Sequence, residues 1–379
     1  MNITISDQAA ELVKTTMADI ETEDPHLYLY VAGGGCSGLQ YGLAVSEGEP
    51  EIDDVVVYNQ IKYKSLSNNN KGNKVSDKTF WIEVNLSTLP TNKRGPSAQY
   101  IDCINRHLLI DCGEGTQTQL RKFGVHFQKI SHIFISHLHG DHFFGLPGLL
   151  STMNLLGRNT GLTIYGPENL HALLNDIFSC GGQQLNFNLN FVPLDFTEEK
   201  VLFEDKLICV KSFPLKHRVP TCGFKIEEKT REYSINAEAT KKLSIPLKDY
   251  PKLKRGENIV LENGKQIDFR SCVLEPKNPR SYAYCSDTYP SDKYLNSIQG
   301  VDMLYHEATF TEELADRAKK TLHSTAKKAA EIAQKANVKK LMLGHLSSRY
   351  ENSEGHLLEA TQIFKDTIVA EDGMVIELL

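Results

Sequence analysis

The chain has 379 residues, of which 40% are hydrophobic and 24% are charged, and its formal net charge is −6 at pH 7. This composition is typical of a globular protein, and the length suits two domains or one large one. The acidic balance argues against indiscriminate nucleic-acid binding, although a local basic patch would still bind RNA. No apolar run approaches the ~20 residues of a membrane span, so we expect no membrane partner.

The first twenty residues, "MNITISDQAAELVKTTMADI", lack the basic and apolar regions of a signal peptide. They predict a short strand followed by an amphipathic helix. The eight cysteines are scattered without a CxxC pair, which favours a reducing cytoplasmic location over a secreted disulfide scaffold. Residues 59–79 are polar and rich in Asn, Lys and Ser, which is a linker composition. We therefore expect a domain boundary near residue 60.

After this linker, short aliphatic runs alternate with helical patterns. Residues 99–104 and 107–113 predict a strand hairpin, and residues 116–124 predict a helix. Further strands are predicted over 130–137, 162–167, 281–287, 302–308 and 339–347, and helices over 144–156 and 324–336, the last with Ser324 or Thr325 as its N-cap. This mixture predicts a layered α/β domain whose functional residues lie where strands end.

The stretch over residues 227–264 has few apolar residues and differs from its surroundings. Between Lys229 and Gly256 eight Lys or Arg residues oppose three acidic ones. This pattern predicts a basic insertion that projects from the core.

The segment "SHLHGDH", residues 136–142, holds four side chains of the type that bind metals. One residue separates His137 from His139, so in an extended segment both side chains point the same way. Asp141 and His142 follow a glycine that permits a sharp turn. Zinc accepts imidazole and carboxylate ligands, and two ions about 3.5–4 Å apart can clamp a phosphate. The alternative is a polar loop with fortuitous histidines, but the pattern after a strand favours an open hydrolytic metal site.

Three further polar residues close apolar strands downstream, namely His217, Asp287 and His345. Taken singly, they could be a surface histidine, a helix N-cap and a turn residue. Together with the first cluster they supply the ligands that a two-metal site still needs.

"SHLHGDH" resembles the signature of the metallo-β-lactamase fold, and other segments narrow the resemblance to the ribonuclease Z family in its short form, which processes tRNA 3′ ends. Those segments are "PTNKRGPSAQ", "LLIDCGEGTQTQLRKFG", "PLKHRVPTCGF", "YCSDT", "HEATF", "HSTAKKAAEIA" and "LMLGHLSSRY". They occur in the family's order and cover about residues 80–379.

The resemblance implies an αβ/βα sandwich with two zinc ions per chain and a homodimer. It implies one zinc ion held by His137, His139 and His217, a second held by Asp141, His142 and His345, and Asp287 bridging them. Asp111 resembles the family's structural aspartate near the site, although a turn residue at a strand end is the simpler explanation.

The implied reaction is hydrolysis of a phosphodiester in precursor tRNA. The metals lower the pKa of water and stabilise phosphoryl charge, and Asp141 orients or deprotonates that water. His323 in "LHST" resembles the family's general acid for the leaving 3′-oxygen. We hypothesise that Glu307 orients His323, the alternative being an ordinary carboxylate at a strand end. The products would be a tRNA 3′-hydroxyl and a 5′-phosphorylated trailer.

Substrate capture is the second requirement, and the family grips tRNA with an inserted arm. Residues 229–256 lie where that arm belongs, and their cations can meet phosphates without reading sequence. Arg94 resembles a residue that contacts the tRNA end. The alternatives are a solvated charged loop and a surface arginine. The expected tRNA contacts are Arg94, Lys252, Lys254 and Arg255.

The sequence departs from the family in two places. The arm reads "IPLKDYPKLKRG", without the Gly-Pro element that many members carry, and "EVNLSTLP", residues 83–90, lacks a glycine-rich turn. The tip of the arm and the edge of the fold are therefore expected to differ.

Residues 1–58 resemble the first half of an A-type iron–sulfur carrier of the HesB/IscA type. Cys36 matches that family's first cluster ligand, but the later Cys-Gly-Cys is missing. One cysteine provides too few ligands for a cluster, so a truncated fragment is expected. The alternative is a docking or dimerisation module whose cluster ligands come in part from a partner.

Two other functions stay open from the residues alone. One is a different hydrolase on the same fold, which would need neither the "HST" segment nor the basic arm. The other is a non-catalytic RNA-binding or iron–sulfur fusion, which metal content would reveal as iron with sulfide instead of two zinc ions per chain.

Overall fold

The computed structural model describes residues 25–33, 39–47, 56–58, 80–85, 94–182 and 184–378. The chain divides into two compact units, residues 1–76 and 77–379. The predicted strand and helix over residues 1–20, the linker over 59–79 and Cys36 lie outside the described residues. Among the described residues, no helix has the length and apolarity that crossing a membrane requires.

The described part of the first unit is one antiparallel sheet. Its strands are β1 (Pro25–Gly33), β2 (Leu39–Glu47) and β3 (Val56–Tyr58), in the order β2-β1-β3.

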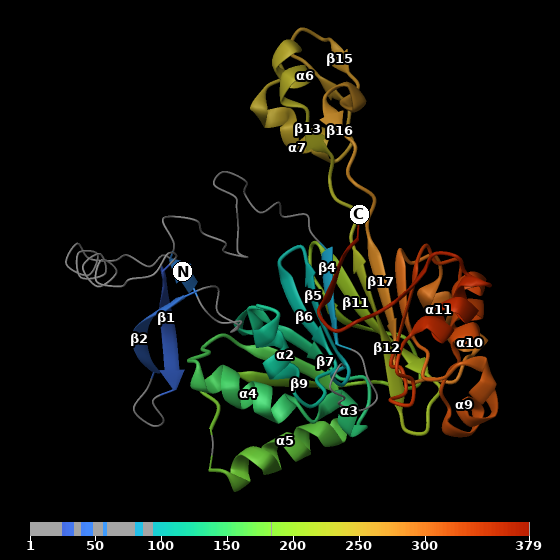
Figure 1. The fold of residues 1–379 in the computed structure, drawn as a ribbon. Helices are drawn as coiled ribbons and strands as arrows, with labels where there is room; N and C mark the ends of the chain where they lie inside the picture. Colours follow the sequence, from blue (N-terminus) through green and yellow to red (C-terminus); the bar gives the residue numbers. More distant parts are fainter. Residues whose placement is uncertain are drawn as a thin grey trace. The chain divides into compact units, whose positions relative to one another are not determined.

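The second unit contains two seven-stranded sheets that face each other (Figure 1). The first sheet has the order β21-β4-β5-β6-β7-β8-β9. Its strands are β4 (Phe80–Asn85), β5 (Ala98–Cys103), β6 (Arg106–Ile110), β7 (His132–Phe134), β8 (Leu162–Gly166), β9 (Leu189–Pro193) and β21 (Met374–Glu377). β5 and β6 pair as an antiparallel hairpin, as predicted, whereas β6, β7, β8 and β9 pair in parallel.

The second sheet has the order β10-β11-β12-β17-β18-β19-β20. Its strands are β10 (Lys200–Glu204), β11 (Ile208–Leu215), β12 (Thr221–Glu228), β17 (Ser281–Cys285), β18 (Met303–Glu307), β19 (Leu341–Gly344) and β20 (Thr367–Val369). β17, β18, β19 and β20 pair in parallel, so their carboxyl ends meet at one edge of the sheet.

Helices cover the outer face of each sheet (Figure 1). Those of the first layer are α2 (Thr116–Lys122), α3 (Gly140–Phe143), α4 (Leu146–Leu155) and α5 (Glu168–Cys180), and those of the second are α8 (Leu295–Ile298), α9 (Ala315–Thr321), α10 (Ala326–Lys335) and α11 (Glu354–Thr361). One buried cluster fills the space between the sheets, and one lies under each helical layer. The predicted αβ/βα sandwich is therefore confirmed.

Local sequence explains two of these elements. The β5–β6 hairpin turns through Ile104 and Asn105, whose φ angles are 53° and 61°. A positive φ is costly for a β-branched residue, but the Ile104 side chain is buried in the core between the sheets. α10 buries its alanines, and the Thr325 hydroxyl caps it by accepting the Lys328 N–H.

The predicted strands were too long at the edge where polar residues follow. Within the strand predicted over residues 130–137, only the three residues of β7 are extended. The strand predicted over 107–113 ends at Ile110, and the one predicted over 339–347 ends at Gly344. The apolar pattern continues into loops there because these loops are also buried. Asp111 and His345 follow two of the strands with φ angles of 58° and 57°, so the chain turns sharply at both.

The inserted stretch forms a small lobe that projects from the second sheet (Figure 1). Its elements are β13 (Ser234–Ile235), α6 (Ala237–Lys242), α7 (Tyr250–Lys254), β14 (Ile259–Val260), β15 (Gln266–Ile267) and β16 (Val273–Leu274). The predicted arm over 229–256 was too short, because β13 pairs with β16. Although residues 227–264 have few apolar residues, the lobe has its own core, made of Ile245, Leu253, Ile259, Ile267, Cys272 and Val273.

Candidate metal and catalytic centre

The predicted ligands all follow strands whose ends meet at one edge of the sandwich. The segment after β7 supplies His137, His139, Asp141 and His142, β11 is followed by His217, β17 by Asp287, and β19 by His345. Glycine is required nearby, because a Cβ on Gly145 would overlap the carbonyl of Gly113 and keep α4 from starting beside the site.

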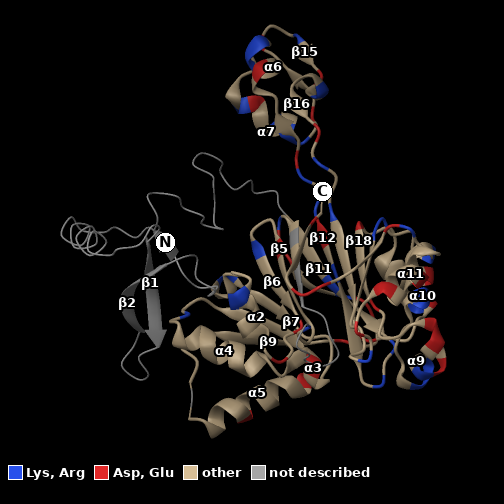
Figure 2. Ribbon diagram, in the orientation of Figure 1, with Lys and Arg blue, Asp and Glu red and all other residues tan. Residues whose placement is uncertain are grey.

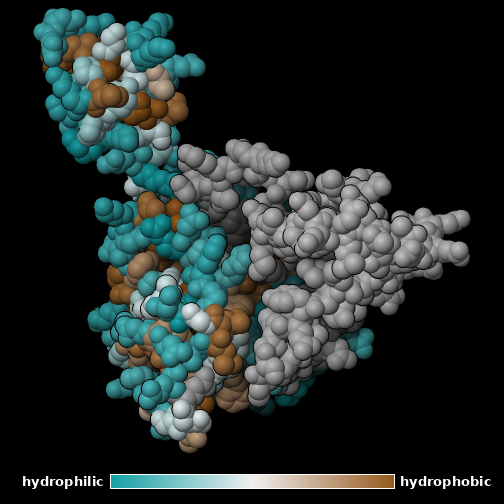
Figure 3. Space-filling view, turned by 90° about the vertical axis from the view of Figure 1, so that its left-hand side faces the viewer, coloured by the Kyte–Doolittle hydropathy of each residue, from teal (hydrophilic) through white to brown (hydrophobic). Residues whose placement is uncertain are grey.

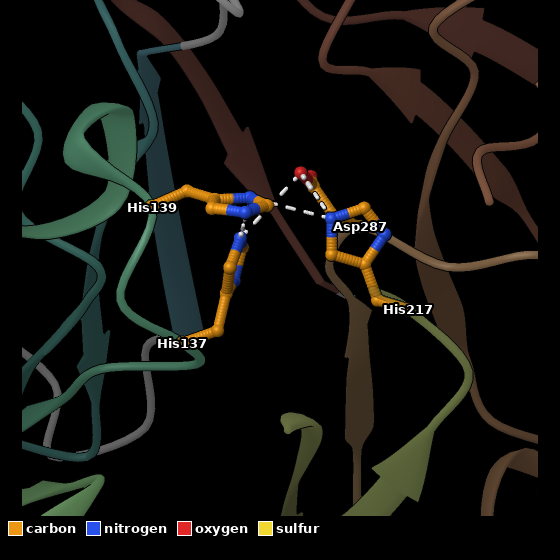
Figure 4. Close-up of side chains that lie close together, drawn as sticks. All are labelled: His137, His139, His217 and Asp287. Carbon is orange, nitrogen blue, oxygen red and sulfur yellow. Dashed lines mark hydrogen bonds and ion pairs between the residues drawn. The ribbon is translucent and has the colours of Figure 1, made fainter. Parts of the chain in front are cut away.

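One group of four side chains converges on a common point (Figure 4). His139 Nδ1 lies 3.1 Å from His137 Nε2 and 3.3 Å from His217 Nε2. Asp287 Oδ2 lies 3.5 Å from His137 Nε2 and 3.7 Å from His217 Nε2. These are the first three predicted ligands together with the predicted bridging carboxylate.

A second group lies on the other side of Asp287. His345 Nε2 lies 3.3 Å from His142 Nε2 and 3.2 Å from Asp141 Oδ2. Asp287 Oδ1 lies 3.1 Å from His345 Nε2 and 3.4 Å from His142 Nε2. The two oxygens of Asp287 therefore face the two groups separately.

The other ring nitrogen of each buried histidine is already occupied. His142 Nδ1 lies 2.7 Å from Asp111 Oδ2, His217 Nδ1 donates to the Leu322 carbonyl at 2.9 Å, and His345 Nδ1 lies 3.1 Å from the Thr309 hydroxyl. These contacts leave each Nε2 facing the centre of its group, the arrangement that metal-binding histidines adopt.

This donor set fits divalent metal ions. Ring nitrogens of neighbouring histidines lie 3.1–3.3 Å apart, and where both carry lone pairs a cation between them would remove their repulsion. A tetrahedral zinc ion with bonds of about 2.0–2.1 Å has ligand atoms about 3.3 Å apart. Asp287 Oδ1 is buried and has no hydrogen-bond partner, as a carboxylate oxygen reserved for a metal would be.

The pKa shifts of His137 and Asp287 also fit a site that binds a cation. Burial lowers the pKa of His137 to about 4, which keeps this imidazole neutral and able to bind metal. Burial alone would raise the pKa of Asp287, but the imidazoles of His345 and His142 outweigh it and hold this pKa well below its usual range. The site therefore concentrates ionised carboxylates that a cation would neutralise.

A second constellation adjoins the metal ligands and centres on His323. Its Nδ1 lies 3.0 Å from Glu307 Oε1 and 3.1 Å from the Thr309 hydroxyl, and its Nε2 lies 4.0 Å from Asp287 Oδ2. Burial alone would lower the pKa of His323, but Glu307 and then Asp287 raise it to about 9. The hypothesised contact between Glu307 and His323 is present.

Glu307 is itself held in place by the backbone. Its carboxylate accepts the N–H groups of Thr288 at 3.0 Å, Thr309 at 2.9 Å and Ser324 at 2.9 Å. It is fully buried, so neither the carboxylate nor the imidazole that it contacts can rotate freely.

Asp111 occupies the structural position that the sequence suggested. Its carboxylate accepts the N–H and hydroxyl of Ser136, at 2.7 and 2.9 Å, and the hydroxyl of Tyr284 at 2.7 Å. With His142 as a further partner it fixes one ligand and the segment that carries the others. Asp111 thus positions proposed ligands through hydrogen bonds and lies outside the proposed ligand set.

Sequence reasoning missed Thr309, Ser136 and Tyr284. Thr309 is the most informative, because its hydroxyl contacts Glu307, His323 and His345 together. Its place two residues after Glu307 in "HEATF" was the available signal.

The predicted tRNA contacts lie elsewhere. Lys252, Lys254 and Arg255 are exposed at the end of α7, in a lobe that carries both basic and acidic positions (Figure 2). Lys252 lies 3.7 Å from Asp249, and Arg255 pairs with Glu257 at 2.7 Å. Arg94 is half-buried and donates to the Tyr350 carbonyl at 2.9 Å.

Comparison with known proteins finds relatives that match about three quarters of the chain. The chain is 45% identical to ribonuclease Z of Porphyromonas gingivalis over 292 residues, which is 77% of this chain and 96% of that protein. It is 44% identical to ribonuclease Z of Parabacteroides distasonis over 288 residues, or 76% of this chain and 95% of the relative.

Solved structures share the fold. The short form of human tRNase Z is 29% identical with a TM-score of 0.58, covering 78% of this chain and 98% of the human chain. The metallo-β-lactamase fold protein YhfI from Bacillus subtilis is 17% identical with a TM-score of 0.55, covering 79% of this chain and 100% of its own, which shows the fold alone. Residues 97–245 match the family described as anti-Pycsar protein Apyc1, which is less than half of the chain.

Proposed function

The chain belongs to the ribonuclease Z family of metallo-β-lactamase fold proteins, and we propose that its two ligand groups hold two zinc ions that serve cleavage of precursor tRNA. It is a metal-dependent tRNA 3′-processing endoribonuclease. The observation that supports the two-metal proposal best is the position of Asp287, whose two oxygens face separate groups of donors.

The first zinc ion would be held by His137, His139 and His217, the second by Asp141, His142 and His345, and both by Asp287. When bound, the two ions would supply a more acidic water and neutralise charge on the phosphoryl oxygens. Residues of this chain perform the remaining tasks.

Asp141 is the ligand best placed to meet water. Its side chain is 19% exposed, whereas that of Asp287 is 3% exposed. One oxygen of Asp141 contacts His345 Nε2, so the carboxylate is fixed at the mouth of the site. It orients the attacking water and accepts its proton as the new phosphorus–oxygen bond forms.

His323 serves the leaving group. Glu307 and Thr309 hold its Nδ1, which turns Nε2 towards the centre. As the bond from phosphorus to the 3′-oxygen breaks, Nε2 gives that oxygen a proton. The products are a tRNA 3′-hydroxyl and a 5′-phosphorylated trailer.

The lobe is the proposed tRNA grip. Its surface is largely hydrophilic with apolar patches (Figure 3), and its exposed apolar side chains are Leu247, Val260 and Leu274. Lys252, Lys254 and Arg255 would contact phosphates there, and Arg94 would act nearer the tRNA end. Phosphate contacts of this kind position a substrate without reading its sequence.

We propose a homodimer, because apolar side chains are exposed on and beside two neighbouring helices. They are Phe144, Leu155, Leu156, Leu173 and Ile177, each at least 38% exposed. Such a surface is costly in water unless a partner covers it. We also propose that the enzyme works in the cytoplasm and that residues 80–379 carry it, residues 1–58 and the linker over 59–79 being dispensable.

The experiment is cleavage of a 3′-extended precursor tRNA, mapped to the nucleotide. The full chain, a chain starting at Lys78, and the variants Asp141→Ala and His323→Ala are compared, with metal content measured for each. Cleavage at the 3′ end by both chains, two zinc ions per chain and loss of activity in both variants are expected. Two bound zinc ions without any tRNA cleavage would overturn the substrate assignment, and one ion per chain would overturn the two-metal proposal.

A further inference from the structure

The two connections of the lobe meet at one pair of residues at the edge of the second sheet, beside which the Lys229 N–H donates to the Leu207 carbonyl at 2.7 Å. The chain leaves the sheet at Glu228, the last residue of β12, and returns at Arg280, immediately before β17. The Glu228 N–H donates to the Arg280 carbonyl at 2.8 Å, and the Arg280 N–H donates to Glu228 Oε2 at 3.1 Å. Beyond this pair, residues 229–233 and 275–279 form no helix or strand until β13 meets β16.

The side chains of this pair form a buried two-pronged contact. Arg280 Nε donates to Glu228 Oε2 at 3.1 Å, and Arg280 Nη2 donates to Glu228 Oε1 at 2.5 Å. The side chains are only 11% and 5% exposed. A planar guanidinium that meets both carboxylate oxygens fixes direction as well as distance, which a lysine ammonium does not.

The same arginine reaches the other sheet. Arg280 Nη1 donates to the Leu378 carbonyl at 2.8 Å, and its guanidinium carbon lies 5.8 Å from the centre of the Phe80 ring. Leu378 donates its N–H to the Phe80 carbonyl at 3.0 Å, beside β4 of the first sheet. The base of the lobe is therefore tied to both sheets of the sandwich through one side chain.

The connection that leads from the lobe back to Arg280 is stiff. Its sequence, "EPKNP" over residues 275–279, contains two prolines, whose φ angles are fixed by their rings. A stiff connection passes the orientation at its root on to the lobe, whereas a flexible one would lose it.

We propose that Glu228 and Arg280 are positioning residues, which set the direction of the lobe and so the distance between its cations and the metal centre. This inference rests on the proposed role of the lobe in gripping tRNA. Neither residue touches the reacting atoms. A lobe held in one direction presents its cations at a high effective concentration to a tRNA whose 3′ end is in the site, and a loosened lobe does not.

The test uses the full chain with Arg280→Lys, which keeps the charge but loses the two-pronged contact, and with Glu228→Gln, which keeps the shape. Two substrates are compared: a 3′-extended precursor tRNA, and bis(4-nitrophenyl) phosphate, which is too small to reach the lobe. We expect KM for the precursor tRNA to rise about tenfold with kcat within about twofold, and kcat/KM for the small diester to stay within about twofold.

The matched control is Arg106→Lys. Arg106 also pairs with a carboxylate, since its Nε and Nη2 both donate to Asp205 Oδ2, at 2.8 and 2.7 Å, between β6 and the turn after β10. It lies on no connection to the lobe, so its loss should leave KM for precursor tRNA unchanged even where the melting temperature falls. Hydrogen exchange should quicken over residues 229–233 and 275–280 in Arg280→Lys and in no strand of the first sheet.

An unchanged KM in Arg280→Lys, or a parallel loss of activity on both substrates, would overturn the positioning role. If the single variants fold poorly, the double variant Glu228→Gln with Arg280→Gln restores an amide-to-amide contact without charge. Two amides do not fix direction as a guanidinium and a carboxylate do, so the KM of the double variant should stay raised, and a folded double variant with a normal KM would refute a role for the charged pair.

Replacing Lys252, Lys254 and Arg255 by alanine separates this inference from the proposed function. If that triple variant raises KM and Arg280→Lys does not, the lobe still grips tRNA and only the positioning role fails. If the triple variant leaves KM unchanged, the proposed role of the lobe fails and the inference falls with it.

Discussion

In the metal centre the carboxylate of Asp111 accepts hydrogen bonds from three residues, whereas on the lobe the ammonium of Lys252 is exposed and lies 3.7 Å from a single carboxylate. Donor atoms in the centre are therefore fixed in position before any substrate arrives. The cations of the lobe can move and adapt to a polyanion. If the lobe captures tRNA as proposed, substitutions in the two regions should change different kinetic constants.

The largest expected effect comes from the residue shared by both metal groups. Asp287→Ala removes a ligand from each group and leaves several imidazoles facing one another without a neutralising carboxylate. We expect activity to fall at least about a thousandfold and bound zinc to drop below one ion per chain, because metal affinity depends on the full set of ligands and on the groups that orient them. Activity and metal analysis of the same preparation provide the check. A variant that keeps two zinc ions would contradict the bridging role.

The next largest effect separates proton transfer from metal binding. His323→Ala removes the proposed proton donor but none of the seven proposed metal ligands. We expect kcat to fall about 10²–10⁴-fold with two zinc ions retained and KM for precursor tRNA nearly unchanged. A precursor tRNA in which sulfur replaces the leaving 3′-oxygen should recover most of the loss, because a thiolate leaves without a proton. Failure to recover with such a substrate would argue against the general acid.

A smaller loss of activity is expected when a residue that only contacts the proposed ligands and proton donor is replaced. Thr309→Val removes the hydroxyl that contacts Glu307, His323 and His345 and leaves the volume almost unchanged. We expect kcat to fall about 10–100-fold, since groups that orient metal ligands have effects of this size.

Thr311→Val is the matched control for that substitution, because Thr311 is also buried but bonds the Tyr350 hydroxyl. It should retain nearly full kcat. Equal losses in the two threonine variants would mean that general packing, and not the contact with the catalytic residues, explains the effect.

The smallest effect on chemistry is expected from the lobe. Replacing Lys252, Lys254 and Arg255 by alanine should raise KM for precursor tRNA about tenfold and leave kcat within about twofold. The dependence of KM on salt should also weaken, because fewer cations meet phosphate. Titrations at several salt concentrations provide the measurement. A fall in kcat instead of a rise in KM would show that the two regions are not separate.

Much of the sandwich could be predicted from local pattern. The hairpin of β5 and β6, the helix α10 and the parallel strands β17, β18 and β19 each have a short-range signature. The strand ends were less predictable, because the buried loop after β7 is as apolar as a strand until it reaches His137. The lobe was misjudged, since its core residues are spread over about thirty positions and show no period.

The sequence alone indicated which side chains the proposed chemistry would use, because metal ligands, the "HEATF" segment and the "HST" segment are local patterns of suitable residue types. Only the tertiary structure decided which oxygen of Asp287 faces which group, that the Thr309 hydroxyl contacts Glu307, His323 and His345, and that Arg280 ties the lobe to Glu228 and to Leu378. Those partners are 52 and 98 positions away in the chain. Contacts over such distances depend on how the sheets pack, and no local pattern in the sequence specifies that packing.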